Sequence, residues 1–152
     1  MPYFLFLCLT ILIIILDLGS KTIFQNILQL QDIIIWKSFI FTLQFNQGIA
    51  FSLPLTGFLQ IMISITVLVA FFFYYQKKPY WTFPLFQIAL AFIFGGALGN
   101  LYERIFYGQV TDFIQVFSWF PVFNLADSFI FTGVVLLIIF ENKISQKITD
   151  KN

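Results

Sequence analysis

Residues 95–127 read GGALGNLYERIFYGQVTDFIQVFSWFPVFNLAD, and within this stretch an apolar segment becomes polar. Its polar side chains include Asn100, Glu103, Arg104, Asp112, Asn124 and Asp127. A charged side chain near the centre of a bilayer costs about 3 kcal/mol, so acids kept at the edge of an apolar segment indicate a functional site. For Glu103 and Arg104, a passive role at the point where a helix leaves the lipid explains the sequence equally well. Asp127 has apolar segments on both sides, which favours a functional role.

The composition predicts a membrane protein. Of the 152 residues, 60% are hydrophobic and 10% are charged, and the mean hydropathy is +0.93. Soluble domains carry roughly 25% charged residues. The length suits about four spans of ~20 residues. We expect one domain over residues 1–152, an all-α membrane bundle with a small β element. Its spans lie near 3–21, 54–75, 81–101 and 123–141, with outer segments near 22–53 and 102–122.

Several classes of function are excluded by the residue types. The net charge is +1, and no basic cluster exists beyond Lys77, Lys78 and the tail lysines, which argues against a nucleic-acid partner. The chain has no histidine and a single cysteine, Cys8, which excludes Ser–His and Cys–His pairs, a His-bearing zinc site and an internal disulfide. A divalent cation prefers about six oxygen ligands, and the sequence does not supply a convincing set of that size. We therefore expect neither a metal nor a cofactor.

The pattern also predicts a β element and an orientation. Apolar and polar residues alternate over 39–46, which is typical of a strand, so we expect a short helical link and a β-hairpin at the membrane surface. The turn at Lys77 and Lys78 is predicted to be cytoplasmic by the positive-inside rule, together with the tail lysines Lys143, Lys147 and Lys151. Both termini would then lie inside, with the polar groups at the outer face.

Helical spacing pairs many of these polar groups. Residues three or four apart share a helix face, and this holds for Asp17 with Lys21, Asn100 with Arg104, and Asn124 with Asp127. The topology brings them to the same face as Asn46 and Asp112. Two close carboxylates in a poorly solvated site hold one proton between them. One of them can then activate water while the other polarises a scissile carbonyl.

Two other functions are weaker. Ser20 and Lys21 could form a serine–lysine pair, but adjacent residues on a helix point away from each other. A channel or transporter subunit would use intramembrane acids, but it would carry polar residues through the depth of the bundle rather than at one edge. For Asp17 with Lys21, an interfacial ion pair worth little remains an alternative to a supporting role.

The motifs GGALGNLYER, VTDFI and FNLAD resemble those of the lipoprotein signal peptidases (signal peptidase II), which are bacterial aspartic peptidases of the cytoplasmic membrane. The patterns D-x-x-S-K at Asp17 and N-x-G-x-A-F at Asn46 also match, while the family's G-N-x-x-D-R has Glu103 at its acidic position. Glutamate keeps the charge but adds a methylene, so we assign it no specific contact.

The resemblance implies a fold and a function. It implies four transmembrane helices with an extracytoplasmic β-cradle, acting as a monomer in the inner membrane. The substrates would be lipidated prolipoproteins in contact with membrane lipid, cut immediately before the diacylglyceryl-modified cysteine. Asp112 and Asp127 would form the catalytic dyad. The residues that would contact the substrate or support the dyad are Asn46, Asn100, Arg104 and Asn124, with Asp17 and Lys21 as the N-terminal motif.

Overall fold

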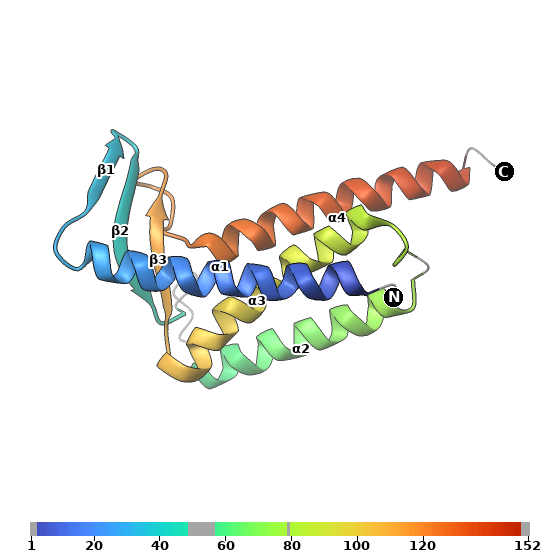
Figure 1. Cartoon of the computed structure of the whole chain (residues 1–152), viewed down its shortest axis with the longest axis horizontal. Coiled ribbons are helices and arrows are strands. Elements are labelled where there is room, and N and C mark those ends of the chain that lie inside the picture. The colour runs from blue at the N-terminus through green and yellow to red at the C-terminus, as the bar shows by residue number, and fades with distance from the viewer. Residues whose placement is uncertain (1–2, 49–56, 79, 150–152) are drawn as a thin grey trace.

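The computed structural model describes residues 3–48, 57–78 and 80–149 as a helical bundle with a small sheet at one end (Figure 1). The helices are α1 (Phe4–Leu28), α2 (Gly57–Gln76), α3 (Pro84–Tyr107) and α4 (Leu125–Thr149). The strands β1 (Ile33–Trp36), β2 (Phe39–Asn46) and β3 (Val110–Gln115) form one antiparallel sheet in the order β1-β2-β3. Within the described ranges, 4 helices are long and apolar enough to cross a membrane. The predicted fold class is confirmed.

Some predicted features lie outside the described residues. Residues 49–56 contain the second half of the N-x-G-x-A-F motif and the predicted start of the second span. Lys151, one of the predicted cytoplasmic lysines, also lies outside them. The described part of the motif, from Asn46 to Gly48, forms a tight turn in which the Gly48 N–H donates to Asn46 Oδ1 over 2.7 Å.

Three of the helices continue past their predicted ends. α1 continues to Leu28 instead of ending near Lys21, α3 continues to Tyr107 instead of ending near 101, and α4 continues to Thr149 instead of ending near 141. The sequence contains no helix breaker in these extensions. α3 ends only at Gly108, whose φ of 70° is left-handed and whose N–H donates to the carbonyl of Arg104. Glycine adopts this conformation without a steric penalty. The extension keeps Glu103 and Arg104 helical.

Glycines allow α1 and α4 to pack closely against α3. A Cβ atom on Gly95 would lie 2.7 Å from the Ile13 side chain of α1, and one on Gly96 would lie 2.5 Å from the Ala126 carbonyl oxygen of α4. Real Cβ atoms essentially never come within 3.0 Å of another heavy atom. These glycines therefore let the neighbouring helices approach closely, and α3 is the central helix of the bundle.

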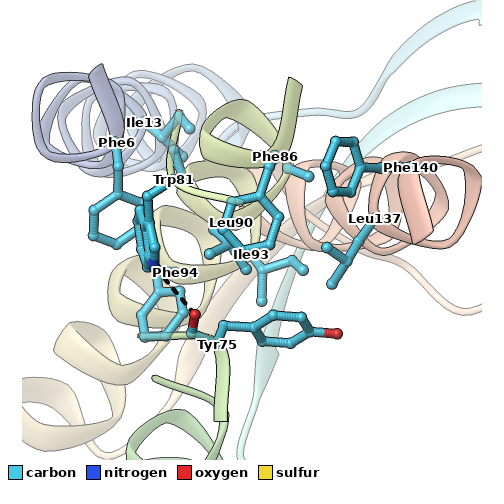
Figure 2. Packing of buried hydrophobic residues seen from close by; sticks show 12 residues of the cluster. Phe6, Ile13, Tyr75, Trp81, Phe86, Leu90, Ile93, Phe94, Leu137 and Phe140 are labelled. Carbon is cyan, nitrogen blue, oxygen red and sulfur yellow. Dashed lines mark hydrogen bonds between the residues drawn. The ribbon is translucent and has the colours of Figure 1, made fainter. Parts of the chain in front are cut away.

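The apolar core lies toward the end of the bundle that carries the two described termini (Figures 1 and 2). Its side chains come from all four helices and from the turn before α3, and those labelled in Figure 2 are Phe6, Ile13, Tyr75, Trp81, Phe86, Leu90, Ile93, Phe94, Leu137 and Phe140. The buried Gln87 amide accepts from the Phe6 N–H over 3.1 Å and donates to the Trp81 carbonyl over 2.7 Å. Hydrophobic packing thus dominates this end of the bundle.

Candidate active site

Asp112 lies on β3 and is held by two amide side chains. The β2–β3 pairing sets Gln44 opposite Asp112, and because side chains alternate along a strand, Asn46 lies on the same face as Gln44. Asn46 Nδ2 donates to Asp112 Oδ2 over 3.0 Å, and Asn124 Nδ2 donates to Oδ1 over 2.7 Å. Asp112 as a whole residue is 3% exposed. Each oxygen therefore has a fixed donor.

Asp127 lies in the first turn of α4, where it forms a reciprocal cap with Asn124. Asn124 Oδ1 accepts from the Asp127 N–H over 3.0 Å, and Asp127 Oδ2 accepts from the Asn124 N–H over 3.1 Å. This arrangement satisfies two backbone donors at the helix start. The other oxygen, Asp127 Oδ1, accepts from Asn100 Nδ2 over 2.8 Å. Asp127 is thus fixed by α3 as well as by its own helix.

Asn124 joins the two acids into one hydrogen-bonded group. Its Nδ2 donates to Asp112 Oδ1 over 2.7 Å and to Asn100 Oδ1 over 3.1 Å, and its backbone N–H donates to Asp127. Asn124 itself is fully buried. We call Asp112, Asp127, Asn46, Asn100 and Asn124 the dyad cluster. It unites residues of β2, β3, α3 and α4 that are up to about half the chain apart in sequence.

A buried ion cluster of Asp17, Lys21 and Glu103 lies next to the dyad cluster. The Lys21 ammonium donates to Asp17 Oδ2 and to Asn100 Oδ1, each over 2.8 Å, and it forms an ion pair with Glu103 Oε2 at 3.1 Å. Lys21 is 1% exposed and Asp17 is 0% exposed. The interpretation of this pair as a plain interfacial ion pair is therefore wrong.

Asp17 also holds the start of α4. Its Oδ1 accepts from the Ala126 N–H over 3.0 Å. A Cβ atom on Gly99 would lie 2.3 Å from Asp17 Oδ2, so this carboxylate fits only beside a glycine. Asp17 thus binds both the Ala126 N–H in the first turn of α4 and the Lys21 ammonium on α1.

Arg104 does not bond to the dyad cluster. It is half-buried, and its buried Nε has no hydrogen-bond partner within the described ranges. With Asn100 it lines one end of an apolar groove of about 390 Å³ between α2, α3 and α4, whose other walls include Ile63, Val67 and Ile130. The groove therefore joins a cationic side chain to apolar walls.

Two further cavities reach the acids themselves. One of about 340 Å³ is lined by Gln44, Asn46 and Asp112 together with Pro121. Another of about 430 Å³ is lined by Asp127 with the rings of Phe120, Phe123 and Phe131. A polar opening thus reaches one acid and an aromatic opening reaches the other.

The surroundings of Asp112 shift its protonation. Burial, followed by the charge of Asp127, raises the pKa of Asp112 to about 6, against the opposing effect of the donors Asn46 and Asn124 and of the Lys21 charge. Near neutral pH, the carboxyl group of Asp112 can therefore hold or release a proton. That is the property required of a general acid or base.

Sequence reasoning missed three polar residues. Glu103 is 3% exposed, and it binds Lys21 and accepts from both the backbone N–H and the hydroxyl of Thr111. Gln25 donates to the Thr111 hydroxyl. The three-residue spacing of Asn100 and Glu103, which puts them on neighbouring parts of one helix surface, could have indicated that Glu103 is buried. No comparable signal exists for Thr111 or Gln25.

The serine–lysine alternative has no geometric support. The Ser20 hydroxyl donates to the Asp17 carbonyl over 2.8 Å, and Lys21 is bound by Asp17, Asn100 and Glu103. For metals, no group of three or more His, Cys, Asp or Glu side chains in the described part of the chain could hold an ion.

Comparisons with known proteins agree on one family. The sequence model of signal peptidase (SPase) II matches residues 9–142. A lipoprotein signal peptidase of Pseudomonas syringae pv. tomato is 41% identical over 145 residues, covering 86% of this chain and 82% of the relative. One of Staphylococcus carnosus is 36% identical over 147 residues, covering 91% of each chain.

Solved structures agree with the sequence comparison. A bacterial membrane enzyme determined by the in meso method at 2.3 Å resolution superposes with a TM-score of 0.81 and 27% identity, covering 93% of this chain and 90% of the other. A second, at 1.9 Å resolution, has a TM-score of 0.78 and 29% identity, with coverage of 88% and 90%. The chain thus belongs to the signal peptidase II family and is a multi-pass membrane peptidase of the lipoprotein signal peptidase type.

Proposed function

We propose that Asp112 and Asp127 are the catalytic dyad of an aspartic endopeptidase. The observation that carries this proposal is that Asn124 donates to both carboxyl groups, to Asp112 Oδ1 over 2.7 Å and to Asp127 Oδ2 over 3.1 Å. Two carboxyl groups bound to the same residue in a poorly solvated site share one proton, because a second negative charge there is unfavourable. The raised pKa of Asp112, to about 6, is consistent with that state.

The shared proton allows hydrolysis without a covalent intermediate. The ionised carboxylate takes a proton from a bound water, and the oxygen of this water attacks the scissile carbonyl carbon. The protonated carboxyl group donates to the carbonyl oxygen and stabilises the charge that develops there. The tetrahedral intermediate then breaks its C–N bond as a carboxyl proton passes to the leaving amine, and the dyad returns to its one-proton state.

The other predicted site residues have two kinds of role. Asn46, Asn100 and Asn124 fix the carboxyl oxygens through their amides, and Asp17 and Lys21 support Asn100 from behind. Arg104 lines the end of the apolar groove. A guanidinium carries several N–H donors that suit a carbonyl oxygen of a bound substrate, so we assign Arg104 to substrate binding.

The substrate that fits this arrangement is a diacylglyceryl-modified prolipoprotein, cut on the N-terminal side of its lipidated cysteine. The relatives are lipoprotein signal peptidases. An apolar groove of about 390 Å³ beside the dyad cluster suits acyl chains or an apolar signal segment. Membrane lipid would border the same groove, because α2 presents apolar side chains along its exposed face.

The same proposal includes an orientation in the bacterial inner membrane. The dyad cluster lies at the sheet end of the bundle, and the described termini lie at the opposite end (Figure 1). Lys77 and Lys78 follow α2 at the end with the termini, and the positive-inside rule makes that end cytoplasmic. The active site would then face outward, in a single domain that works as a monomer.

Sided membrane vesicles test substrate and orientation together. We expect right-side-out vesicles carrying the protein to cleave an added diacylglyceryl-modified precursor peptide, and to cleave the unmodified peptide at least about 10²-fold more slowly, because the acyl chains supply binding energy to the reaction. Inside-out vesicles should need permeabilisation first. An aspartic-peptidase inhibitor should block the reaction. Equal cleavage of both peptides would contradict the substrate, and cleavage by sealed inside-out vesicles would contradict the orientation.

A further inference from the structure

Three hydrogen-bonded side chains, from α1, β3 and α3, hold the β3 strand that carries Asp112. The Gln25 amide of α1 donates to Thr111 Oγ1, and this hydroxyl donates to Glu103 Oε1 of α3 over 2.8 Å. The Thr111 N–H donates to the other oxygen, Glu103 Oε2, over 2.9 Å. Thr111 is 1% exposed and Glu103 is 3% exposed. We call Gln25, Thr111 and Glu103 the β3 clamp.

The β3 clamp replaces a missing neighbouring strand. β3 is an edge strand of the three-stranded sheet: it pairs with β2 on one side, and on the other side Ile114 forms an isolated bridge with Phe123. Its outward N–H groups need other partners, and the Thr111 N–H finds one in Glu103 while the Phe113 N–H donates to the Phe123 carbonyl over 3.0 Å. Asp112 therefore lies between two residues, Thr111 and Phe113, whose backbone N–H groups are both hydrogen-bonded outside the sheet.

The clamp acts from the face of the sheet opposite the acids. Phe45 pairs with Thr111 and Gln44 pairs with Asp112, so the side chains of Thr111 and Asp112 point to opposite faces. Thr111 borders a cavity of about 410 Å³ that is also lined by Thr22, Gln25 and Tyr102 and does not include either acid. Thr111 therefore lines this cavity and neither of the two cavities that reach Asp112 and Asp127.

One lysine connects the clamp to the second acid. Lys21 Nζ contacts Glu103 Oε2 at 3.1 Å and Asn100 Oδ1 at 2.8 Å. Asn100 in turn donates to Asp127 over 2.8 Å. The same buried ammonium group therefore helps to fix both β3, through Glu103, and Asp127, through Asn100.

We propose that Thr111 and Glu103 are positioning residues that set where Asp112 stands relative to Asp127. The inference rests on the proposed dyad. The Thr111 hydroxyl and N–H bond to side chains on two helices, to Gln25 on α1 and to Glu103 on α3. A shift of β3 would therefore break several hydrogen bonds at once. A misplacement of about 1 Å can lower a rate by about 10²-fold, and so the clamp acts on kcat through Asp112 rather than by contact with the substrate.

The clean test is a pair of substitutions at Thr111 in the full-length protein in lipid. Thr111→Val keeps the side-chain shape and removes the hydroxyl, while Thr111→Ser keeps the hydroxyl. We expect Thr111→Val to lower kcat about tenfold, the effect of losing a hydrogen bond that positions a reacting group, with KM changed less than about twofold. Thr111→Ser should restore kcat to near the native value. Thr22→Val is the matched control, because the Thr22 hydroxyl donates to the Leu18 carbonyl of its own helix and not to β3.

The pH profile separates positioning from simple loss of folded protein. The charged groups around Asp112 are Asp127 on α4, Lys21 on α1 and Arg104 on α3, and β2 contributes none. If β3 shifts, Asp112 loses the donors Asn46 and Asn124, which hold its pKa down. The limb of the profile that belongs to Asp112 should therefore move to higher pH in Thr111→Val. Partial unfolding would lower the amplitude at every pH alike.

The outcomes distinguish this inference from the dyad itself. A native kcat and an unmoved limb in Thr111→Val would overturn the clamp, and so would a loss of amplitude without a shift. Glu103→Gln serves as a second variant, for which we expect a loss at least as large as that of Thr111→Val, because it weakens the contacts to both Thr111 and Lys21. If Asp112→Asn kept native activity, the proposed function would fail instead.

Discussion

Asp127→Asn and Asp112→Asn should each lower kcat for a lipidated precursor by about 10⁴-fold, because in the proposed mechanism each removes a group that carries a proton. The substitutions are nearly isosteric, and at each site the amide oxygen keeps one of the two hydrogen bonds that the carboxylate accepted. The protein should therefore stay folded and inserted. The measurement is single-turnover cleavage by purified variants in lipid, with thermal unfolding as a check on the fold.

Asp32→Asn provides the control. Asp32 is exposed, just before β1, and is not part of the dyad cluster. We expect it to keep native kcat. Native turnover by either dyad variant would show that its acid is not needed, whereas equal losses in all three variants would point to an effect of charge on the membrane surface.

Lys21→Met should destabilise the protein by about 3–5 kcal/mol, the usual cost of removing one partner from a buried ion pair. The ammonium is the cation shared by Asp17 and Glu103, and it also fixes Asn100. Without it, two carboxylates remain buried beside the dyad cluster. The free energy of unfolding in detergent measures the effect, and kcat should fall as well because Asn100 loses a donor.

A double variant tests whether the uncompensated charge is the cause. Lys21→Met combined with Asp17→Asn should recover part of the lost stability, because one of the two orphaned charges is removed as well. Lys37→Met, at an exposed position in the β1–β2 turn, is the control and should cost little. An unfolding free energy of Lys21→Met equal to that of the native protein would contradict the role of the ion cluster.

The helices and the grouping of the acids could be predicted because they depend on local sequence. Long apolar runs predict spans through length alone, and three- and four-residue spacings predict which side chains share a helix face. The ends of α1 and α3 were predicted less well. Glu103 and Arg104 resemble residues where a helix leaves the lipid, but Glu103 has buried partners on α1 and β3, and the helix continues.

β3 could not be recognised from its sequence. Strands are detected by alternation between a buried and an exposed face, yet Val110, Thr111, Asp112 and Phe113 are all buried. Its partners, Asn46 and Glu103, come from elements far away in the chain or across a turn. The β3 clamp and the buried ion cluster depend on such tertiary contacts, which no spacing in the sequence reveals.

The pH dependence of kcat/KM tests the shared proton most directly, because this ratio reports ionisations of the free enzyme. Acid should abolish activity by protonating both carboxyl groups. Raising the pH should also abolish it, as Asp112 loses its proton with a pKa of about 6 and two negative charges remain. We therefore predict a bell-shaped profile whose alkaline limb lies near pH 6. A kcat/KM that stays level or rises from about pH 5 to about pH 8 would contradict the account, because a single ionised carboxylate would then suffice.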